Sequence, residues 1–231
     1  MKILVNDKIA EKIESITGVK TLGLKPYDKL DKPICSHADM LICIIDKTIF
    51  CYSDYYEKNI DVFAKITGYN IIKSNQQCKA IYPYDIGLNV LVIGKRIFCK
   101  KAYVVKEILD YAEINHYKII NVNQGYSCCS TLAIDENSAI TSDKGMFDAL
   151  VSEGIDTLLV SNCDIKLEGY NCGFVGGSGY IFDKTLYFFG SIDNLREKSE
   201  VKQWLRKRNY KLISIFMGDV SDFGGAKLVY D

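Results

Sequence analysis

Polar side chains of the types that enzymes use interrupt the apolar runs of this chain at several points. They are His37, Asp39, Asp85, Asn89, Cys129 and Asp222. A carboxylate can bind a cation, a thiolate can attack an electrophilic carbon, and an imidazole can accept or deliver a proton. Two glycines, Gly176 and Gly177, interrupt another run and would let a ligand approach the backbone. The residue types predict a pocket for a small cationic ligand.

Strand geometry groups these side chains further. Residues two apart in a strand point to the same side. If each segment begins a strand, three pairs share a face: His37 with Asp39, Asp85 with Asn89, and Cys129 with Thr131. Cys128 would then point the opposite way. We therefore expect one imidazole, two or three carboxylates and the Cys129 thiol around a common pocket.

An internal repeat determines how such segments could meet. Residues 44–51 and 92–99 are identical at five of eight positions, and residues 180–187 and 133–140 are weaker copies. The turn positions 46, 94, 135 and 183 are 48, 41 and 48 residues apart. Each copy is typical of a β-hairpin, followed by a helical stretch and a further strand. A repeat of this length predicts a ring or an array of similar units.

The two ends of the chain complete the repeat. Four full units leave a strand at 225–230, and at the other end a strand at 2–5, a helix at 8–16 and a strand at 19–24. Joined, they form a fifth unit, which predicts one α/β domain over residues 1–231, built as a closed five-unit α/β propeller. The alternative is an open doubly wound sheet, but the hairpin in every unit argues against it.

Composition narrows the function classes. Lys plus Arg and Asp plus Glu are both 29, so no net charge attracts nucleic acid, and the basic run at 202–208 is typical of a solvated helix face. No apolar run is long enough for a membrane span, and residues 1–6 are typical of a strand and not of a secretory leader, so we expect no secretory signal. Nine cysteines without a Cys-x-x-Cys pair indicate reduced thiols in a cytoplasmic protein, with neither disulfides nor a metal site.

Structural explanations remain open for each candidate. A lone histidine such as His37 is often a core residue, a free cysteine such as Cys129 is often a buried hydrophobe, and Asp85 or Asp222 can cap turns. The glycines at 176–179 lack the spacing of a phosphate-binding loop. A strand that a ligand can approach closely is the preferred interpretation of that segment.

The chain resembles a known family at these residues. The run His37-Ala38-Asp39-Met40 and the pair Gly224-Gly225, on a five-unit ring, resemble the pentein or guanidino-group modifying superfamily of deiminases, dimethylarginine dimethylaminohydrolases and amidinotransferases. Small uncharacterised bacterial members are similar in further short motifs. The resemblance implies that His37 is a general acid/base and that Asp39 binds a guanidinium group, with no cofactor.

The chain departs from the deiminase pattern at one position, and this difference leaves two functional hypotheses open. The deiminases carry their nucleophile in a Gly-Gly-x-x-Cys run, whereas this chain has Leu228 in the cysteine position. Cys129 could supply the thiol for a C–N hydrolase or amidinotransferase, through a thiouronium intermediate. The substrate would be held by the remaining candidates, Asp39, Asp85, Asn89, Asp222, Gly176 and Gly177. Alternatively, the protein is a non-catalytic pentein that binds a small cationic ligand or a protein partner.

Overall fold

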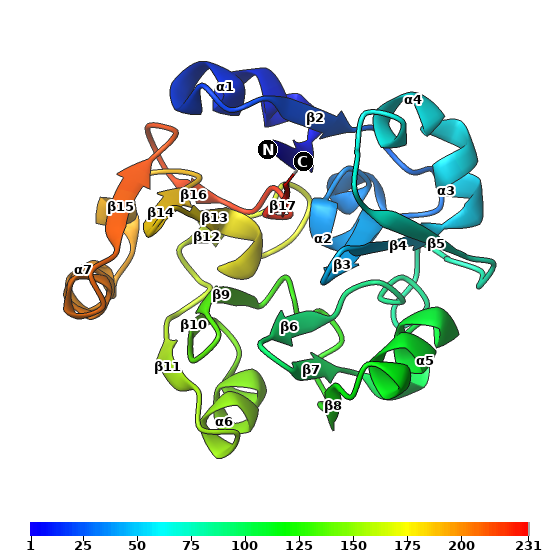
Figure 1. Cartoon of the computed structure of the whole chain (residues 1–231). Coiled ribbons are helices and arrows are strands. Elements are labelled where there is room, and N and C mark those ends of the chain that lie inside the picture. Colours follow the sequence, from blue (N-terminus) through cyan, green and yellow to red (C-terminus); the bar gives the residue numbers. More distant parts are fainter. Residues whose placement is uncertain (231) are drawn as a thin grey trace.

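The computed structural model describes residues 1–230 and has five three-stranded sheets set around a central axis (Figure 1). In every sheet the middle strand pairs antiparallel with the opening strand, and in parallel with the third strand. A helical segment links the middle and third strands. The predicted closed α/β propeller is confirmed.

The first two units follow one another along the chain. The first contains β3 (Ile42–Ile45), β4 (Thr48–Tyr52), α3 (Ser53–Lys58), α4 (Ile60–Phe63) and β5 (Asn70–Ser74). The second contains β6 (Leu91–Ile93), β7 (Arg96–Cys99), the 3-10 helix η2 (Lys101–Tyr103), α5 (Lys106–Ile114) and β8 (Lys118–Asn121).

The third and fourth units have the same order. The third contains β9 (Thr131–Asp135), β10 (Ser138–Thr141), α6 (Lys144–Ser152) and β11 (Asp156–Leu159). The fourth contains β13 (Gly179–Phe182), β14 (Thr185–Phe188), the 3-10 helix η4 (Ile192–Asn194), α7 (Lys198–Lys207) and β15 (Lys211–Ser214).

The fifth unit joins the two ends of the chain, as predicted. β17 (Ala226–Val229) pairs antiparallel with β1 (Lys2–Asn6), with Lys2 opposite Val229. α1 (Asp7–Thr17) then leads to β2 (Thr21–Leu24), which lies parallel to β1. The Asn6 side chain accepts a hydrogen bond from the Lys8 amide and so caps α1, and the left-handed Gly18 ends the helix.

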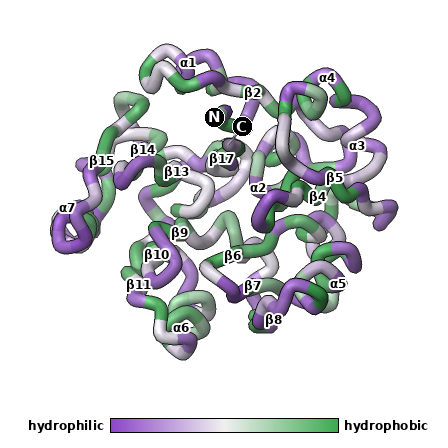
Figure 2. The backbone as a smooth tube through the Cα atoms, in the orientation of Figure 1, coloured by the Kyte–Doolittle hydropathy of each residue, from purple (hydrophilic) through white to green (hydrophobic). Residues whose placement is uncertain are grey.

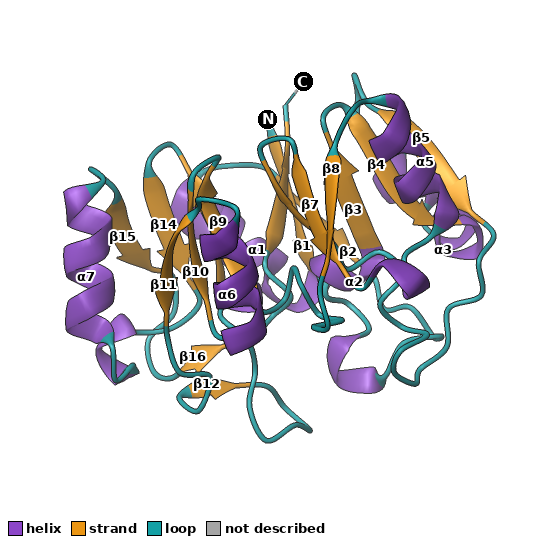
Figure 3. Cartoon of the chain, turned by 90° about the horizontal axis from the view of Figure 1, so that it is seen from below, coloured by secondary structure: helices purple, strands orange, loops and turns teal. Residues whose placement is uncertain are grey.

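Four short features were not predicted. The 3-10 helix η1 (Lys32–Ile34) and the helix α2 (Ala38–Leu41) precede β3, and the 3-10 helix η3 (Gly176–Ser178) precedes β13. A small parallel sheet joins β12 (Ile165–Lys166) to β16 (Val220–Ser221). Figure 3 shows this sheet at one end of the ring, with both chain termini at the other end.

The lysine that recurs in the hairpin turns contacts a tyrosine that also recurs. In three units the turn lysine lies over the ring of the tyrosine that precedes the third strand, with the ammonium nitrogen 4.1–4.6 Å from the ring centre. The pairs are Lys47 with Tyr69, Lys95 with Tyr117, and Lys184 with Tyr210. Each such contact contributes about 0.5–1 kcal/mol at an exposed site. The turn is therefore tied to the far strand of its own sheet.

The same tyrosines also connect neighbouring units. The Tyr117 hydroxyl donates to Asp46 of the first unit over 2.8 Å, and the Tyr210 hydroxyl donates to Asp135 of the third over 3.2 Å. At the closure, the Tyr69 hydroxyl accepts a hydrogen bond from the Tyr230 amide. The repeated residues thus hold each unit and also bridge to the unit before it.

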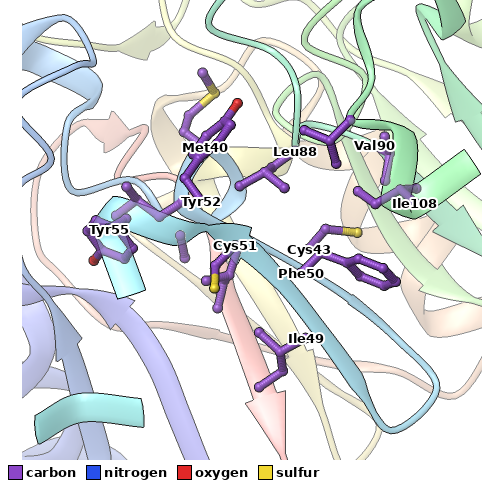
Figure 4. Close-up of a cluster of buried hydrophobic side chains, with 14 of the residues drawn as sticks. Met40, Cys43, Ile49, Phe50, Cys51, Tyr52, Tyr55, Leu88, Val90 and Ile108 are labelled. Atoms are coloured by element: carbon purple, nitrogen blue, oxygen red, sulfur yellow. The ribbon is translucent and has the colours of Figure 1, made fainter. Parts of the chain in front are cut away.

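The core lies between the sheets and their helices. Its largest cluster surrounds β3 and β4, where Phe50, Tyr52 and Cys51 are at most 1% exposed (Figure 4). Full burial of a large apolar side chain contributes about 1.5–3 kcal/mol. The outer helix α7 is strongly hydrophilic, as Figure 2 shows. Within residues 1–230, no helix is long and apolar enough to cross a membrane.

Candidate functional site

A cavity of about 290 Å³ brings together three of the sequence candidates. His37, Cys129 and Asp222 all line it, although they are far apart in the sequence. Aromatic and apolar side chains form much of the remaining wall, among them Tyr126, Tyr170, Phe174, Met40, Leu167 and Ile34. We call this cavity the thiol pocket. It combines a nucleophile, an acid/base group and a carboxylate in an otherwise apolar space.

His37 is held by the short helix that it precedes. It is the N-cap of α2, and its Nδ1 lies 3.7 Å from Asp222 Oδ1 with both side chains 2% exposed. Gly224, at φ +79°, packs directly against the imidazole, where a Cβ would overlap the His37 side chain. The ring is therefore fixed between a carboxylate and a backbone that approaches closely.

Asp222 is a buried carboxylate with defined donors. Oδ1 accepts from the Gly224 amide and Oδ2 from the Phe174 amide, each over 2.9 Å. Burial raises the pKa of Asp222 to about 6; the nearby His37 opposes the rise and Asp39 adds to it. Gly177 lies against the carboxylate so closely that no Cβ fits there. Gly177 was predicted to let a ligand approach the backbone closely. In the structure, the group that approaches it is the Asp222 carboxylate.

Cys129 lies on the other wall, in an acidic setting. Its sulfur accepts a hydrogen bond of 2.9 Å from Asn89 Nδ2, and the side chain is 5% exposed. Burial raises the pKa of the Cys129 thiol well above its ordinary value, and Asp39 and Asp222 raise it further. The free thiol is therefore protonated at neutral pH. A bound cation would offset the carboxylates and favour the thiolate.

Asn89 holds the two walls together. Its Nδ2 donates to the Asp39 carbonyl over 3.0 Å and to Cys129, and its Oδ1 accepts from the Cys128 amide over 2.8 Å. Nδ2 is also 3.2 Å from Met40 Sδ. This buried amide therefore acts as a cross-brace between the α2 segment and the turn that carries the thiols.

Asp39 faces a second cavity, which corrects the prediction that it shares a side with His37. Because residues 38–41 are helical and not extended, the period of two does not apply there. Asp39 lines a cavity of about 230 Å³ enclosed by the five opening strands, and neither carboxylate oxygen has a hydrogen-bond partner within residues 1–230. We call this cavity the axial chamber.

Cys128 and Cys129 face different cavities. Residues 127–130 form a turn before β9, so Cys128 lines the axial chamber together with Thr131, while Cys129 lines the thiol pocket. The prediction that Cys129 and Thr131 share a face was therefore wrong, whereas the opposed directions of the two thiols are observed. Successive side chains in a turn do not alternate between two sides as they do in a strand.

Lys227 completes the axial chamber and was missed in the sequence. Its Nζ donates to Cys128 Sγ over 3.1 Å. Burial alone would lower the pKa of Lys227, but Cys128 and Asp39 raise it above the ordinary value. Lys227 is the one charged residue in the run 225–230, and a lone charge on an inner strand was the available signal.

The remaining candidates lie outside the thiol pocket. Asp85 is behind Tyr126, whose hydroxyl donates to Asp85 Oδ2 over 2.6 Å. Asp85 and Asn89 do not lie on a strand, because β6 begins only at Leu91. Gly176 belongs to the 3-10 helix η3, not to a strand, and lines the axial chamber. Burial raises the pKa of Asp85, against the Tyr126 hydrogen bond.

Two further observations concern alternative chemistry. Leu228 packs in an apolar cluster with Ile3, Val5 and α1, so no nucleophile stands at that position of β17. In the part of the chain that the structure describes, no group of three or more His, Cys, Asp or Glu side chains is arranged to hold a metal ion. Thiol chemistry is what the described side chains of the pocket can carry.

Comparisons with known proteins agree with this architecture. The family described as a family of unknown function (DUF6873) matches residues 3–226. Dimethylarginine dimethylaminohydrolase from Pseudomonas aeruginosa, in complex with citrulline, superposes with a TM-score of 0.57 at 7% identity, over 92% of this chain and 91% of that one. A search of curated proteins by sequence gives no match.

Two other solved structures extend the comparison. SxtG, an amidinotransferase of saxitoxin biosynthesis from Microseira wollei, has a TM-score of 0.56 at 12% identity, over 94% of this chain and 76% of that one. Agmatine deiminase from C. jejuni has a TM-score of 0.54 at 13% identity, over 92% and 74%. At such identities the likeness establishes the fold, which is the pentein fold.

Proposed function

The chain belongs to the family of unknown function DUF6873 and has the pentein fold, and from that premise we propose that it acts on a small guanidino or amidino compound by covalent thiol catalysis. The observation that carries the proposal is the shared cavity of His37, Cys129 and Asp222. The solved structures with this fold include an enzyme in complex with citrulline, an amidinotransferase and an agmatine deiminase.

Electrostatics supports a cationic substrate. Asp222 lines the pocket directly and Asp39 is close enough to raise the pKa of the Cys129 thiol, so the pocket favours positive charge. The aromatic wall of Tyr126, Tyr170 and Phe174 suits the flat face of a guanidinium group. A cation bound there also lowers the cost of forming the thiolate.

The proposed reaction has two stages. In the first, the Cys129 thiol gives its proton to Asp39 and its sulfur bonds to the guanidinium carbon; His37 then protonates the departing amine as the C–N bond breaks. The product of this stage is a thiouronium on Cys129. In the second, water or another amine attacks the same carbon and loses a proton to His37; the C–S bond then breaks, and Asp39 returns its proton to the sulfur to restore the thiol.

Labelling with chloroacetamidine, a cationic alkylating agent, tests the nucleophile. We expect one adduct, mapped to Cys129 by peptide mass spectrometry, and protection by excess methylguanidine. Cys128→Ser is the matched control and should be labelled like the unmodified protein, whereas Cys129→Ser should not be labelled. Labelling at Cys128, or none at either thiol, contradicts the proposal.

A second candidate function rests on Leu228 and on the protonated state of the free Cys129 thiol. These observations favour a pentein that binds a small cation without turnover. Such a protein would gain thermal stability from methylguanidine or agmatine but release no ammonia, urea or amine from a panel of guanidino and amidino compounds. If the unmodified protein releases product from a compound of that panel and Cys129→Ser does not, the protein is an enzyme and this second candidate is wrong.

A further inference from the structure

The axial chamber contains two reactive groups, Cys128 and Lys227, that the proposed function does not use. Cys128 and Lys227 both line it and are hydrogen-bonded to each other, and Asp39 also lines its wall. The chamber has a volume of about 230 Å³ and is separate from the thiol pocket. Asp39 is the one group that takes part in both proposed reactions, whereas Cys128 and Lys227 belong to the axial chamber alone.

Three observations make this chamber more than a packing gap. Burial raises the pKa of the Cys128 thiol, and the Lys227 ammonium, which donates to its sulfur over 3.1 Å, opposes that rise and favours negative charge there. Both side chains are partly exposed, so a small molecule can reach them through the chamber. The Asp39 side chain is 2% exposed, and within residues 1–230 both of its carboxylate oxygens have no hydrogen-bond partner. A buried carboxylate without a donor is a rare feature that points to a missing ligand or a proton to be accepted.

We propose that the axial chamber is an oxidation site, at which hydrogen peroxide converts the Cys128 thiol to a sulfenic acid. Asp39 accepts the thiol proton, and the sulfur attacks one peroxide oxygen so that an S–O bond forms and the O–O bond breaks. Lys227 donates a proton to the departing hydroxide, giving water, and then recovers a proton from Asp39. The sum is one thiol and one peroxide to one sulfenic acid and one water, with sulfur oxidised and peroxide reduced.

The chamber suits this oxidant in size and charge. A water molecule occupies about 30 Å³ in the liquid, so a chamber of about 230 Å³ has room for a peroxide together with several waters. Strand residues such as Val92, Ala133 and Ile181 form apolar parts of its wall, which a small neutral molecule can pass. Lys227 is placed to stabilise both the attacking thiolate and the leaving oxygen.

The other thiols of the protein provide internal comparisons. Among the cysteines of residues 1–230, Cys128 is the one whose sulfur accepts a hydrogen bond from a lysine ammonium. Cys163 is more exposed, and Cys43 lines the same chamber but is 3% exposed. If exposure alone governs oxidation, Cys163 reacts first. If the arrangement around Lys227 governs it, Cys128 does.

The experiment measures which thiol becomes sulfenic acid. The folded protein is treated with substoichiometric hydrogen peroxide in the presence of dimedone, which traps sulfenic acids, and adducts are mapped over time by mass spectrometry. We expect Cys128 to be trapped faster than Cys163 in the unmodified protein. Faster trapping at Cys163, or none at Cys128, overturns the proposal without any variant.

Charge variants test the role of Lys227. Lys227→Met should slow trapping at Cys128 about tenfold, the effect on thiolate fraction of one pKa unit, while Lys227→Arg should retain most of the rate. An unchanged rate in Lys227→Met overturns the role of the ammonium. Trapping at the core thiols Cys51 and Cys99 would show that a variant has unfolded, in which case the comparison between Cys128 and Cys163 decides.

The outcome is separable from the proposed function. Dimedone trapping at Cys128 is measured without substrate and should persist in Cys129→Ser, because that sulfur faces the other cavity. Conversely, chloroacetamidine labelling at Cys129 should persist in Cys128→Ser. Either site can therefore fail its test while the other passes.

Discussion

The thiol pocket and the axial chamber differ in charge although one peptide bond separates their cysteines. Around Cys129 are Asp222, an imidazole and aromatic rings, and around Cys128 are the Lys227 ammonium and small strand residues. The turn at 127–130 sends the two side chains to opposite cavities. Neighbours in sequence thus acquire different chemistry from charges supplied by distant units of the ring.

Asp39 connects the two environments. It lines the axial chamber, yet it raises the pKa of both Cys128 and Cys129 and of Asp222. Lys227 is its nearby counter-charge, since Asp39 in turn raises the pKa of Lys227. The two cavities therefore share one buried carboxylate, that of Asp39. Substitutions in either cavity test how far the properties of Cys128 and Cys129 differ.

The largest effect is expected at Asp222. Asp222→Asn removes the charged partner of a cation in the thiol pocket, and a hydrogen bond to a charged group is worth about 1.5–3 kcal/mol, so affinity for methylguanidine should fall about 10- to 100-fold. Asp85→Asn is the matched control, because Asp85 lies behind Tyr126. Isothermal titration measures both, and equal losses would contradict the assignment of the pocket.

The pH dependence follows from the raised pKa of Asp222. A cation binds the ionised carboxylate, so affinity should increase as pH rises through about 6. Stability behaves oppositely: the contribution of Asp222 is fully present below its ordinary pKa of 3.8 and is lost as pH rises through about 6, because the unfolded state ionises first. Urea unfolding from pH 4 to 7 should show this decline, and Asp222→Asn should flatten it.

A smaller effect is expected at the brace between the cavities. Asn89→Ala leaves buried amides and a carbonyl without partners, which should lower the free energy of unfolding by about 1–3 kcal/mol. It should also blur the distinct reactivities of Cys128 and Cys129, because their turn loses its anchor. Asn59→Ala, at a buried asparagine that bonds the Tyr55 carbonyl, serves as the control. It should cost stability without altering either thiol, and the same change in thiol labelling in both variants would refute the role of the brace.

The smallest effect is expected at Thr131. Thr131→Val removes its hydrogen bond of 3.0 Å to the Thr141 hydroxyl, with an expected cost of about 1 kcal/mol in urea unfolding. Because Thr131 lines the axial chamber, chloroacetamidine labelling at Cys129 should be unchanged. A clear loss of that labelling would show that the two cavities are not independent.

The architecture could be predicted because it repeats. The turn lysines and the tyrosines before the third strands recur in sequence, and the structure shows them in contact. Even the division of the fifth unit between 2–24 and 225–230 followed from the strands left over at each end. Strands and helices can be recognised in a sequence because their apolar residues recur with a period of two or of 3.6.

The fine geometry of the site could not be predicted in this way. His37, Asp39, Cys128 and Cys129 lie in a short helix and a turn, where side-chain direction depends on local dihedral angles and not on a period. The partners that set their charge, such as Lys227 for Cys128, come from other units. Residue types indicated the chemistry, whereas the division into two cavities required the three-dimensional arrangement.

The pairing of β17 with β1 has a consequence for biosynthesis. Because residues 226–229 are synthesised after the four complete units, the nascent chain can neither pair β17 with β1 nor place the Lys227 ammonium beside Cys128 until those units have been made. Contacts between residues that are far apart in the sequence, such as those of β1 and β17, also form slowly. The axial chamber, which Ala226 and Lys227 line, is therefore completed only when β17 pairs with β1.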